Sequence, residues 1–547
     1  MSRTFERIIR SPLHPVAVLL YPILALAADN RAEILLKDTY RLLILALFIS
    51  LTAVFLIKRF SQRHRRWLLT LSLLFIIFSS YGHLYNLTRG LTLGPTLIGR
   101  HRFLLFAMAL LLGLAILWIF NRRRDLATLY TGFNLMSLVL LAFPLVTLLR
   151  YEFIFWRIET ANQETSGPQL NFASPGQPPD VYYIILDSYA REDVLRDIYG
   201  FDNHAFIEQL REFGFYVADD SQSNHSSTSF SLASSLNLNY IQALDLELPP
   251  GSYPRALMET IRNNLVMRAL KDLGYTTIAT ASGTFPTSLT NADIFLSPEI
   301  ENVQTNFFSY MNQLNPFEEI YLHTTMIRAP LDLLRQQTQA GFLKWVEDAG
   351  GLTRQRTLVL TAFEHLEQIP MISGPKFVFT HIISPHRPYV FSATGEVLHQ
   401  SEAFSLEDTS PAEAPQDEFE RYRNQLLYIN QRTLEAIENI ISQSDVDPII
   451  ILQADHGPAF GFNWHSPDKK NLETKFPILN AYYMPEQCQR MLYPSITPVN
   501  SFRIMFNCLY QTDLDLLPDR SYFSDHHSNA EYQFIPVENL LESDTIE

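Results

Sequence analysis

Cysteine is scarce in this chain, whose 547 residues include only Cys488 and Cys508. Neither belongs to a C-x2-C pair, which disfavours a zinc site built on cysteine thiolates. The sequence leaves open whether the two residues form a disulfide or remain as buried thiols. A disulfide would indicate an oxidising compartment.

Acidic residues are scarce in the first part of the chain. Residues 1–150 carry 18 lysines and arginines against 5 aspartates and glutamates, whereas residues 151–547 carry 24 against 52. One uniform globular enzyme does not show this division, and the acidic second part disfavours nucleic-acid binding, because phosphate backbones need basic surfaces. A hydrophobic content of 47% excludes a disordered chain.

Long apolar runs fill the basic first part. Each is close to the roughly 20 residues that a helix needs to cross about 30 Å of hydrocarbon, so residues 1–150 are predicted to form a transmembrane domain of about five helices. The first run contains Pro15 and Pro22, and a re-entrant or interfacial segment is the alternative there. The runs are Leu13–Ala28, Leu42–Ile57, Trp67–Leu87, Phe103–Phe120 and Leu126–Leu149.

Basic residues mark the connections between these runs. Lys58–Arg66 contains five of them and Arg122–Arg124 three, so the positive-inside bias predicts that both connections are cytoplasmic. A single span separates Arg122–Arg124 from the rest of the chain. The sequence therefore predicts a multi-pass protein of the inner or plasma membrane with an extracytoplasmic C-terminal domain.

Residues 151–179 are predicted to form a juxtamembrane segment and a linker, because Arg157–Pro179 is rich in glycine and proline. Residues 180–547 alternate β-rich runs with helical patterns, which indicates an α/β domain with a mostly parallel sheet flanked by helices. We expect strands at Val181–Leu186, Thr276–Thr280, Phe377–Ile383, Ile449–Gln453 and Ile478–Tyr483, and helices at Arg255–Leu273 and Phe419–Ser442.

Polar side chains follow several of these strands. Asp187 follows the first, His381 and His386 lie at the end of the third, and Asp455 and His456 follow the fourth. Taken singly, each is more simply a capping aspartate or a satisfied histidine. Ligands of α/β sheets bind beyond the carboxyl ends of the strands, so one cleft can gather all three groups. Carboxylate and imidazole donors suit a divalent cation, zinc or manganese.

A hydroxyl nucleophile for such a site is available in Asn224–Asn237, which reads NHSSTSFSLASSLN. The simpler interpretation is a serine-rich turn that caps the helix containing Leu232 and Leu236. A helix N-terminus also stabilises an anionic phosphate through its unpaired backbone N–H groups. Coordination to a metal would lower the pKa of a hydroxyl there and make it a nucleophile.

The order of these motifs resembles the alkaline phosphatase/sulfatase superfamily. An aspartate at a strand end is followed by a hydroxyl about 40 residues on, then by Pro385-His386-Arg387-Pro388-Tyr389, and then by Asp455-His456-Gly457. With about five spans before an exported domain, the chain looks like lipoteichoic acid synthase and the lipid A phosphoethanolamine transferases. The resemblance implies an alkaline-phosphatase-like, sulfatase-like catalytic domain over residues 180–547.

The resemblance also implies roles for individual residues. Thr228 matches the nucleophilic threonine that also binds metal, and one or two divalent cations are expected. Asp187 stands where the transferases usually have glutamate. The remaining metal ligands would be Asp455 and His456, and His386 would contact the substrate phosphate. His465 lies a few residues past Asp455-His456-Gly457 and would be either a second such histidine or a ligand of a second metal. Arg387 and Arg191 are the nearest basic candidates for phosphate contacts, with a surface salt bridge as the alternative for each.

The predicted function is transfer or hydrolysis of a phosphoglycerol or phosphoethanolamine group on envelope lipids or glycans, through a covalent threonine intermediate. A formylglycine sulfatase is disfavoured, because Thr228 is followed by Ser-Phe-Ser and not by the C-x-P-S-R pattern. The alternatives are a phosphodiesterase or other sulfatase-type hydrolase and, from a different class, a non-catalytic envelope protein. The sequence does not choose between transfer and hydrolysis, because both use the same core residues.

Overall fold

The computed structural model of the protein divides into two compact units, which are described separately. Unit 1 comprises Met1–Trp156 and Met311–Gly351, and unit 2 comprises Arg157–Tyr310 and Leu352–Glu547. The predicted cytoplasmic residues Arg122–Arg124 lie outside the described part of the chain. The structure describes residues 11–31, 34–94, 96–121, 125–163, 172, 177–250, 252–284, 286–298, 315–335, 351–398, 416–465, 467, 469–525, 528 and 530–538.

Every predicted apolar run of unit 1 contains a helix. Four helices are long and apolar enough to cross a membrane, whereas α2 has 16 residues, fewer than the roughly 20 of a span. Large apolar side chains such as Phe106 and Leu117 are 71% and 72% exposed, which suits contact with lipid. The helices are α2 (His14–Asp29), α3 (Tyr40–Phe60), α4 (His64–Thr88), α5 (His101–Phe120) and α6 (Ala127–Gln163), with a 3-10 turn at Leu36–Thr39 and a hairpin of β1 (Thr92–Leu93) and β2 (Thr96–Leu97) before α5.

Helix α6 continues to Gln163, beyond Arg157, where the linker was predicted to begin. The reason is local, since Arg157–Gln163 contains neither glycine nor proline and nothing in it stops a helix. Most of the remaining predicted linker lies outside the described residues.

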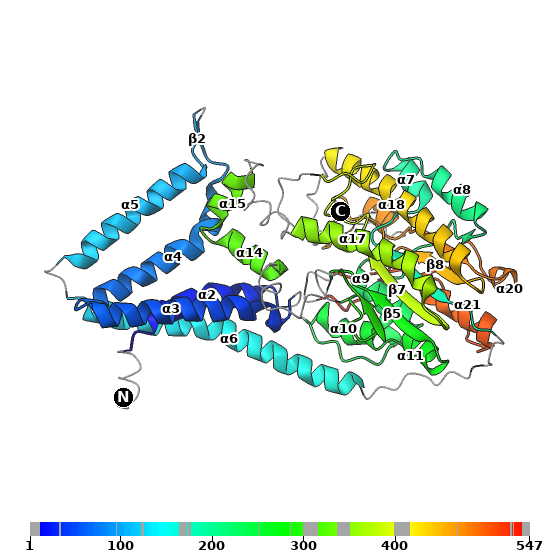
Figure 1. Ribbon diagram of the computed structural model, residues 1–547, viewed down its shortest axis with the longest axis horizontal. Coiled ribbons are helices and arrows are strands. Elements are labelled where there is room, and N and C mark those ends of the chain that lie inside the picture. The colour runs from blue at the N-terminus through cyan, green and yellow to red at the C-terminus, as the bar shows by residue number, and fades with distance from the viewer. Residues whose placement is uncertain are drawn as a thin grey trace. The chain divides into compact units, whose positions relative to one another are not determined.

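Unit 1 also contains a segment from much later in the chain. Helices α14 (Pro316–Thr324) and α15 (Arg328–Arg335) follow one another, and α14 packs against α2 and α4 (Figure 1). The buried carboxylate of Glu318 pairs with Arg41 at 2.8 Å. The backbone of α14 approaches α4 so closely at Gly82 that a Cβ there would lie 2.1 Å from His323 O. Residues that the sequence placed inside the catalytic domain thus pack on the membrane helices.

A seven-stranded mixed sheet forms the centre of unit 2. Its strand order is β4-β9-β8-β3-β7-β5-β6; the four pairs among β8, β3, β7, β5 and β6 are parallel, and β9 is antiparallel to both β8 and β4. The predicted order of apolar helices followed by a mostly parallel α/β sheet is therefore confirmed. The strands are β3 (Val181–Leu186), β4 (Tyr216–Val217), β5 (Thr276–Thr280), β6 (Ile294–Leu296), β7 (Lys376–Ile382), β8 (Ile449–Gln453) and β9 (Asn480–Tyr483).

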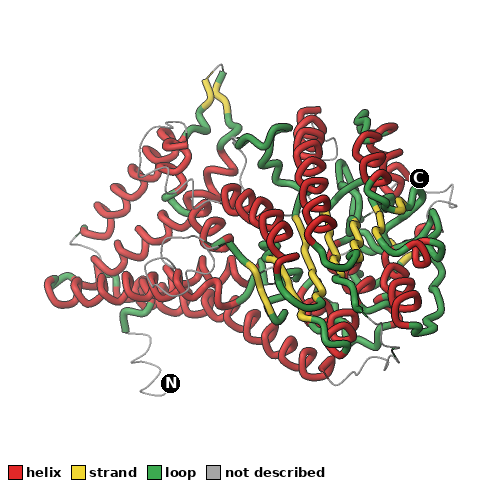
Figure 2. Tube along the Cα trace, turned by 45° about the vertical axis from the view of Figure 1, so that its right-hand side comes forward, coloured by secondary structure: helices red, strands yellow, loops and turns green. Residues whose placement is uncertain are grey.

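Helices cover both faces of this sheet (Figure 2). Side chains of β3 point alternately to the two faces of the sheet. Tyr182, Ile184 and Leu186 belong to the hydrophobic core on one face, and every second residue from Val181 to Ile185 belongs to the core on the other face. One face is covered by α7 (Glu192–Asp197), α8 (His204–Glu212), α17 (Gly351–Gln368) and α18 (Gln416–Gln443). The other is covered by α9 (Thr228–Leu236), α10 (Arg255–Arg262), α11 (Leu265–Asp272) and α21 (Pro498–Tyr510). The remaining elements are 3-10 turns at Ile241–Ala243 and Ile369–Met371, α19 (Lys469–Lys475), α20 (Glu486–Gln489), β10 (Tyr522–Phe523) and β11 (Ile535–Pro536).

The helix predicted over Arg255–Leu273 is wrong in one respect, because it is two helices. α10 ends at Arg262, and the side chain of Asn264 accepts a hydrogen bond from Met267 N at 2.7 Å, which caps a new helix, α11. Asparagine in this position satisfies an otherwise unpaired N–H of the first turn. The apolar spacing continues across the break, so periodicity alone did not reveal it.

Cys488 and Cys508 form a disulfide that joins α20 to α21. The bond resolves the two alternatives that the sequence left open. A disulfide of this kind persists in an oxidising compartment and is rare in the cytosol.

We expect the double variant Cys488→Ser, Cys508→Ser to lose about 3 kcal/mol of unfolding free energy, the entropic contribution of a closed loop of roughly this length. Guanidinium unfolding of the purified chain measures the loss. Wild-type protein reduced with dithiothreitol should behave like the variant. Equal stability of oxidised and reduced protein would contradict a structural role for the bond.

Candidate active site

Three strand ends meet at one edge of the sheet of unit 2. Asp187 follows β3, His381 is the penultimate residue of β7, and Asp455 lies two residues beyond β8. Parallel pairing of β3 with both neighbours sets their register, and Asp187 N continues the ladder by donating to Ile382 O at 3.0 Å. Consequently all three side chains lie at the carboxyl edge, where α/β sheets bind ligands.

The side chains of Asp187, His381 and Asp455 converge on one point. One ligand atom from each residue lies within 4.8 Å of the others, and all three residues are buried. His381 Nε2 lies 3.3 Å from Asp187 Oδ2, yet neither His381 Nε2 nor Asp455 Oδ2 forms a hydrogen bond. Buried polar atoms without partners are costly, and a shared divalent cation would satisfy both of them. The predicted metal site therefore fits the residues present.

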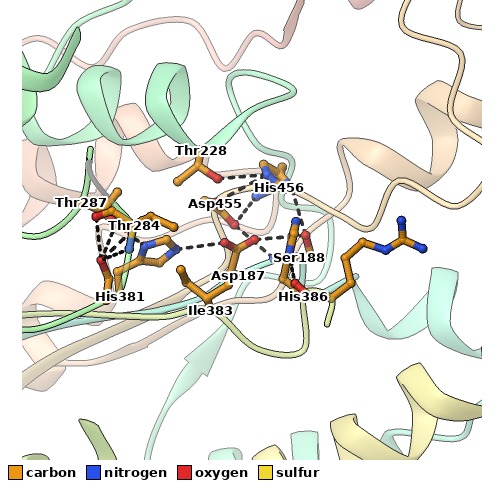
Figure 3. A network of polar contacts seen from close by, with 12 residues as sticks. Asp187, Ser188, Thr228, Thr284, Thr287, His381, Ile383, His386, Asp455 and His456 are labelled. Atoms are coloured by element: carbon orange, nitrogen blue, oxygen red, sulfur yellow. Dashed lines mark hydrogen bonds and ion pairs between the residues drawn. The ribbon is translucent and has the colours of Figure 1, made fainter. Parts of the chain in front are cut away.

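Thr228 and His456 lie directly beside this cluster, and Figure 3 shows the side chains directed toward one another. Thr228 is the first residue of α9 and its Oγ1 lies 3.2 Å from His456 Nε2. His456 Nε2 is also 3.5 Å from Asp455 Oδ2. Four residues predicted as metal ligands from the sequence, Asp187, Thr228, Asp455 and His456, are thus brought together.

Hydrogen bonds at Nδ1 orient both histidines. His456 Nδ1 lies 2.9 Å from Gly457 O, and His381 Nδ1 lies 2.8 Å from Thr287 Oγ1. A hydrogen bond at one ring nitrogen sets the orientation of the ring. The Nε2 atoms of both histidines therefore face the cluster, where they could bind a metal ion.

Ser188 ties the cluster to the backbone. Its φ of 63° lies in the left-handed region, which turns the chain sharply after Asp187. In this position Ser188 N donates to Asp455 Oδ1 at 3.2 Å, and Ser188 Oγ donates to Asp187 Oδ1 at 3.1 Å. These bonds hold the two carboxylates at fixed orientations.

Asp187 is ionised in this environment. Burial alone raises the pKa of its carboxyl group, but the neighbouring imidazoles of His386 and His381 outweigh burial and hold the pKa well below its usual range. The carboxylate is therefore available as an anionic ligand.

His386 reaches the site from the loop after β7. Its backbone N donates to Asp187 O at 3.0 Å, and its side chain lines a small hollow with Ser188 and Tyr422. The next residue, Arg387, forms an ion pair with the buried carboxylate of Glu418. The side chain of His386 is thus positioned where it could contact a substrate. The guanidinium of Arg387, in contrast, is paired with a residue of α18.

His465 and Arg191 are not brought to the cluster. His465 is 71% exposed and pairs through Nδ1 with Asp525 at 2.7 Å. Arg191 pairs with Asp193 and donates to Ser221 O. The roles suggested for these residues in binding substrate phosphate remain predictions.

Lys475 is a site residue that sequence reasoning missed. Its ammonium group is fully buried, 3.2 Å from His456 Nδ1 and over the ring of Trp464. Gly457 makes this approach possible, because a Cβ there would lie 2.2 Å from Thr474 O. The sequence did contain one indication that Lys475 is buried. This lysine stands immediately before the apolar run Phe476–Leu479, where a charged side chain is unusual. His381 was predicted from its strand end to lie in the same cleft, but it was not among the four metal ligands that the resemblance implied.

His225 lies just before the nucleophile segment, in a cage of rings from Phe230, Tyr240, Tyr522 and Phe534. Burial lowers the pKa of His225 to about 3 from its ordinary value of 6.5. Between these values the unfolded chain binds a proton that the folded chain does not. The free energy of unfolding therefore falls as the pH falls below 6.5, by about 2 kcal/mol at pH 5.

Unfolding of the full chain by urea at pH 7 and pH 5 tests this effect. We expect His225→Gln to remove about 2 kcal/mol of the difference between the two pH values, because glutamine does not titrate. His204→Gln is the matched control, because His204 is exposed and pairs only with Glu192 among the contacts described. An unchanged pH dependence in His225→Gln would contradict the assignment.

No protein-family model and no curated protein sequence matches the chain. Solved structures do match it. The chain is similar to the C-terminal periplasmic domain of EcEptC from Escherichia coli in complex with zinc, with 14% identity and a TM-score of 0.41 over 69% of this chain and 99% of that one.

Two further solved structures also match the chain. Lipooligosaccharide phosphoethanolamine transferase A (EptA) from Neisseria meningitidis, an integral membrane protein, has 12% identity and a TM-score of 0.36 over 92% of this chain and 95% of that one. The putative sulfatase yidJ from Bacteroides fragilis has 13% identity and a TM-score of 0.37 over 65% and 83%.

Proposed function

We propose that the chain is a membrane-anchored, metal-dependent enzyme of the sulfatase-like type, with residues 180–547 supplying the catalytic site. It transfers or hydrolyses a phospho-alcohol group on envelope lipids or glycans through a covalent threonine intermediate. The observation that carries this proposal is the position of the Thr228 hydroxyl, which opens α9 and lies 3.2 Å from His456 Nε2 beside three converging ligand atoms.

The proposed ligands of the cation are Asp187, Thr228, Asp455 and His456. We add His381 for two reasons. A ring nitrogen of His381 lies within 4.8 Å of carboxylate oxygens of both Asp187 and Asp455, and its Nε2 forms no hydrogen bond. A bound zinc or manganese ion lowers the pKa of a hydroxyl group and neutralises charge on phosphoryl oxygens.

In the first step Thr228 Oγ1 forms a bond to phosphorus as the bond between phosphorus and the first alcohol oxygen breaks. The hydroxyl proton of Thr228 is passed, directly or through solvent, to the departing alcohol. In the second step another alcohol, or water, attacks the phosphothreonine and restores the hydroxyl. Phosphoglycerol and phosphoethanolamine are the groups for which these residues are proposed.

Positive charge around Thr228 would stabilise the phosphoryl oxygens. The first N–H groups of α9 have no acceptor within a helix, so the start of α9 favours an anion. The buried side chain of Lys475 lies 3.2 Å from His456 Nδ1 and would add to this positive charge, and His386 approaches from the loop after β7, where its backbone N donates to Asp187 O.

The extracytoplasmic location is part of the proposal. Apolar helices α3 to α6 hold the chain in the membrane by their length and composition, and the Cys488–Cys508 disulfide suits an oxidising compartment. Anchorage at this surface would keep the site near lipid-borne donors.

Turnover by the purified full-length chain in phospholipid vesicles tests the function. With zinc or manganese present, we expect release of diacylglycerol from phosphatidylethanolamine or phosphatidylglycerol, and a phosphorylated adduct on the peptide that contains Thr228. A rate of diacylglycerol release that rises when a sugar alcohol is added indicates transfer. A rate that stays the same with and without the sugar alcohol indicates hydrolysis. Absence of both release and adduct would favour the non-catalytic envelope protein.

A further inference from the structure

A cavity of about 440 Å³ lies within the helices of unit 1. Its volume is within the range of ligand sites, roughly 300–1,000 Å³. Helices α2, α4 and α6 line it, and Thr324 of α14 borders it. All of the residues that line the cavity belong to unit 1.

The lining extends along α2 over several helical turns. Lining residues on this helix run from Ala17 to Asp29, a rise of about 18 Å at 1.5 Å per residue. One leaflet of the hydrocarbon core is about 15 Å thick. The cavity thus has the length of a single acyl chain that lies along a transmembrane helix.

The lining changes character along this length. Ala17, Val18, Phe133, Met136 and Leu140 make one end mostly apolar, with Ser137 as a polar residue among them. Asp29 and His83 lie near the C-terminal ends of α2 and α4. Because α3 returns the chain between them, α2 and α4 run in the same direction and both polar residues lie at the same end.

A negatively charged and a positively charged side chain lie at that end. Asp29 is exposed and is the one carboxylate among the described residues that line the cavity. Two residues further, Arg31 donates to Ala28 O and its guanidinium lies 5.4 Å from the centroid of the Tyr151 ring. A headgroup with an anionic phosphate and a cationic amine matches this pair.

We propose that the cavity is a binding site for a zwitterionic membrane glycerophospholipid, with one acyl chain along α2 and an ammonium-bearing headgroup beside Asp29. The large exposed apolar side chains of α3, α5 and α6 place these helices in contact with lipid, so lipid is the available ligand. Small residues of α2, above all Ala25, leave the space that the chain fills.

Photolabelling of the full-length chain in vesicles tests the site. The vesicles contain phosphatidylethanolamine, phosphatidylglycerol and a trace of phosphatidylethanolamine with a diazirine in its acyl chain. After irradiation, we expect adducts to concentrate on the cavity-lining parts of α2, α4 and α6, above the level on exposed α5. Equal labelling of α5 and the cavity-lining segments would overturn the proposal.

Two matched variants separate the cavity from the general lipid surface. Ala25→Phe fills the cavity, and we expect labelling of its walls to fall to the level on α5. Ala109→Phe makes the same change at an exposed position of α5 and should leave labelling of the cavity unchanged. Cavity labelling that survives Ala25→Phe at the wild-type level would contradict the site.

The headgroup assignment has its own test, which does not disturb packing. Wild-type protein should label more strongly with the phosphatidylethanolamine probe than with a phosphatidylglycerol probe, and Asp29→Asn should abolish that preference. Equal labelling by the two probes in wild-type protein would overturn the assignment of a zwitterionic lipid. Because labelling needs no turnover, these results are independent of whether the proposed enzymatic function is correct.

Discussion

Replacement of Thr228 by alanine should reduce the rate of diacylglycerol release by at least about 1,000-fold, as removal of a nucleophile does in other covalent enzymes. The variant should also lose the phosphorylated peptide. The Thr228 side chain is only partly buried, and its described polar contact is with His456 Nε2. Loss of the hydroxyl therefore removes the attacking atom with little effect on the fold.

Two other variants make this result specific. Thr228→Ser keeps a hydroxyl at the start of α9 and should retain measurable turnover. Ser229→Ala changes the adjacent hydroxyl and should leave the rate close to that of wild type. A fully active Thr228→Ala would refute the nucleophile assignment, and an inactive Ser229→Ala beside an active Thr228→Ala would move it by one residue.

Substitution of Asp455 by asparagine should abolish metal binding and activity together. We expect zinc affinity to fall at least about 100-fold, since changes even to groups that only support a ligand cost 10- to 100-fold. Asparagine keeps an acceptor for Ser188 N and His456 N, which both donate to Asp455 Oδ1, so the local backbone is preserved. Metal content by mass spectrometry and zinc titration by calorimetry measure the loss.

The control for this change is Asp447→Asn, which removes a carboxylate from an exposed position before β8. It should keep wild-type metal content. Saturating zinc at about 100 times Kd should stabilise the wild-type fold by about 2.7 kcal/mol, and chelation should remove that stabilisation. A wild-type chain that binds no metal, or an Asp455→Asn variant that binds as well as wild type, would contradict the proposed site.

Secondary structure in unit 2 followed closely from sequence patterns. β3, β5, β7 and β8 lie within a residue of their predicted bounds because each is a short run rich in apolar and β-branched residues. The break between α10 and α11 was not predicted, because Asn264 interrupts the backbone hydrogen bonds without interrupting the apolar spacing. The local sequence pattern thus predicted where helices and strands form better than it predicted where a helix is broken in two.

The candidate site was predicted in part for a related reason. Asp187, Asp455 and His456 stand at strand ends, and a parallel sheet necessarily brings such ends to one edge. Lys475 was missed because it comes from α19, whose approach depends on the contact between Gly457 and Thr474. Arg387 and His465 were chosen by nearness in sequence, yet their side chains pair with Glu418 and Asp525.

The sequence by itself determined the apolar helices, the parallel α/β core and the residues that follow the strands, because hydrophobic length and periodicity are properties of local chain segments. Only the tertiary structure decided that residues near Glu318 pack on α2 and α4, that His381 joins the carboxylates, and that a cavity lies beside Ala25. Each of these three features depends on contacts between segments that are far apart in the chain. Such contacts cannot be predicted from the local sequence pattern.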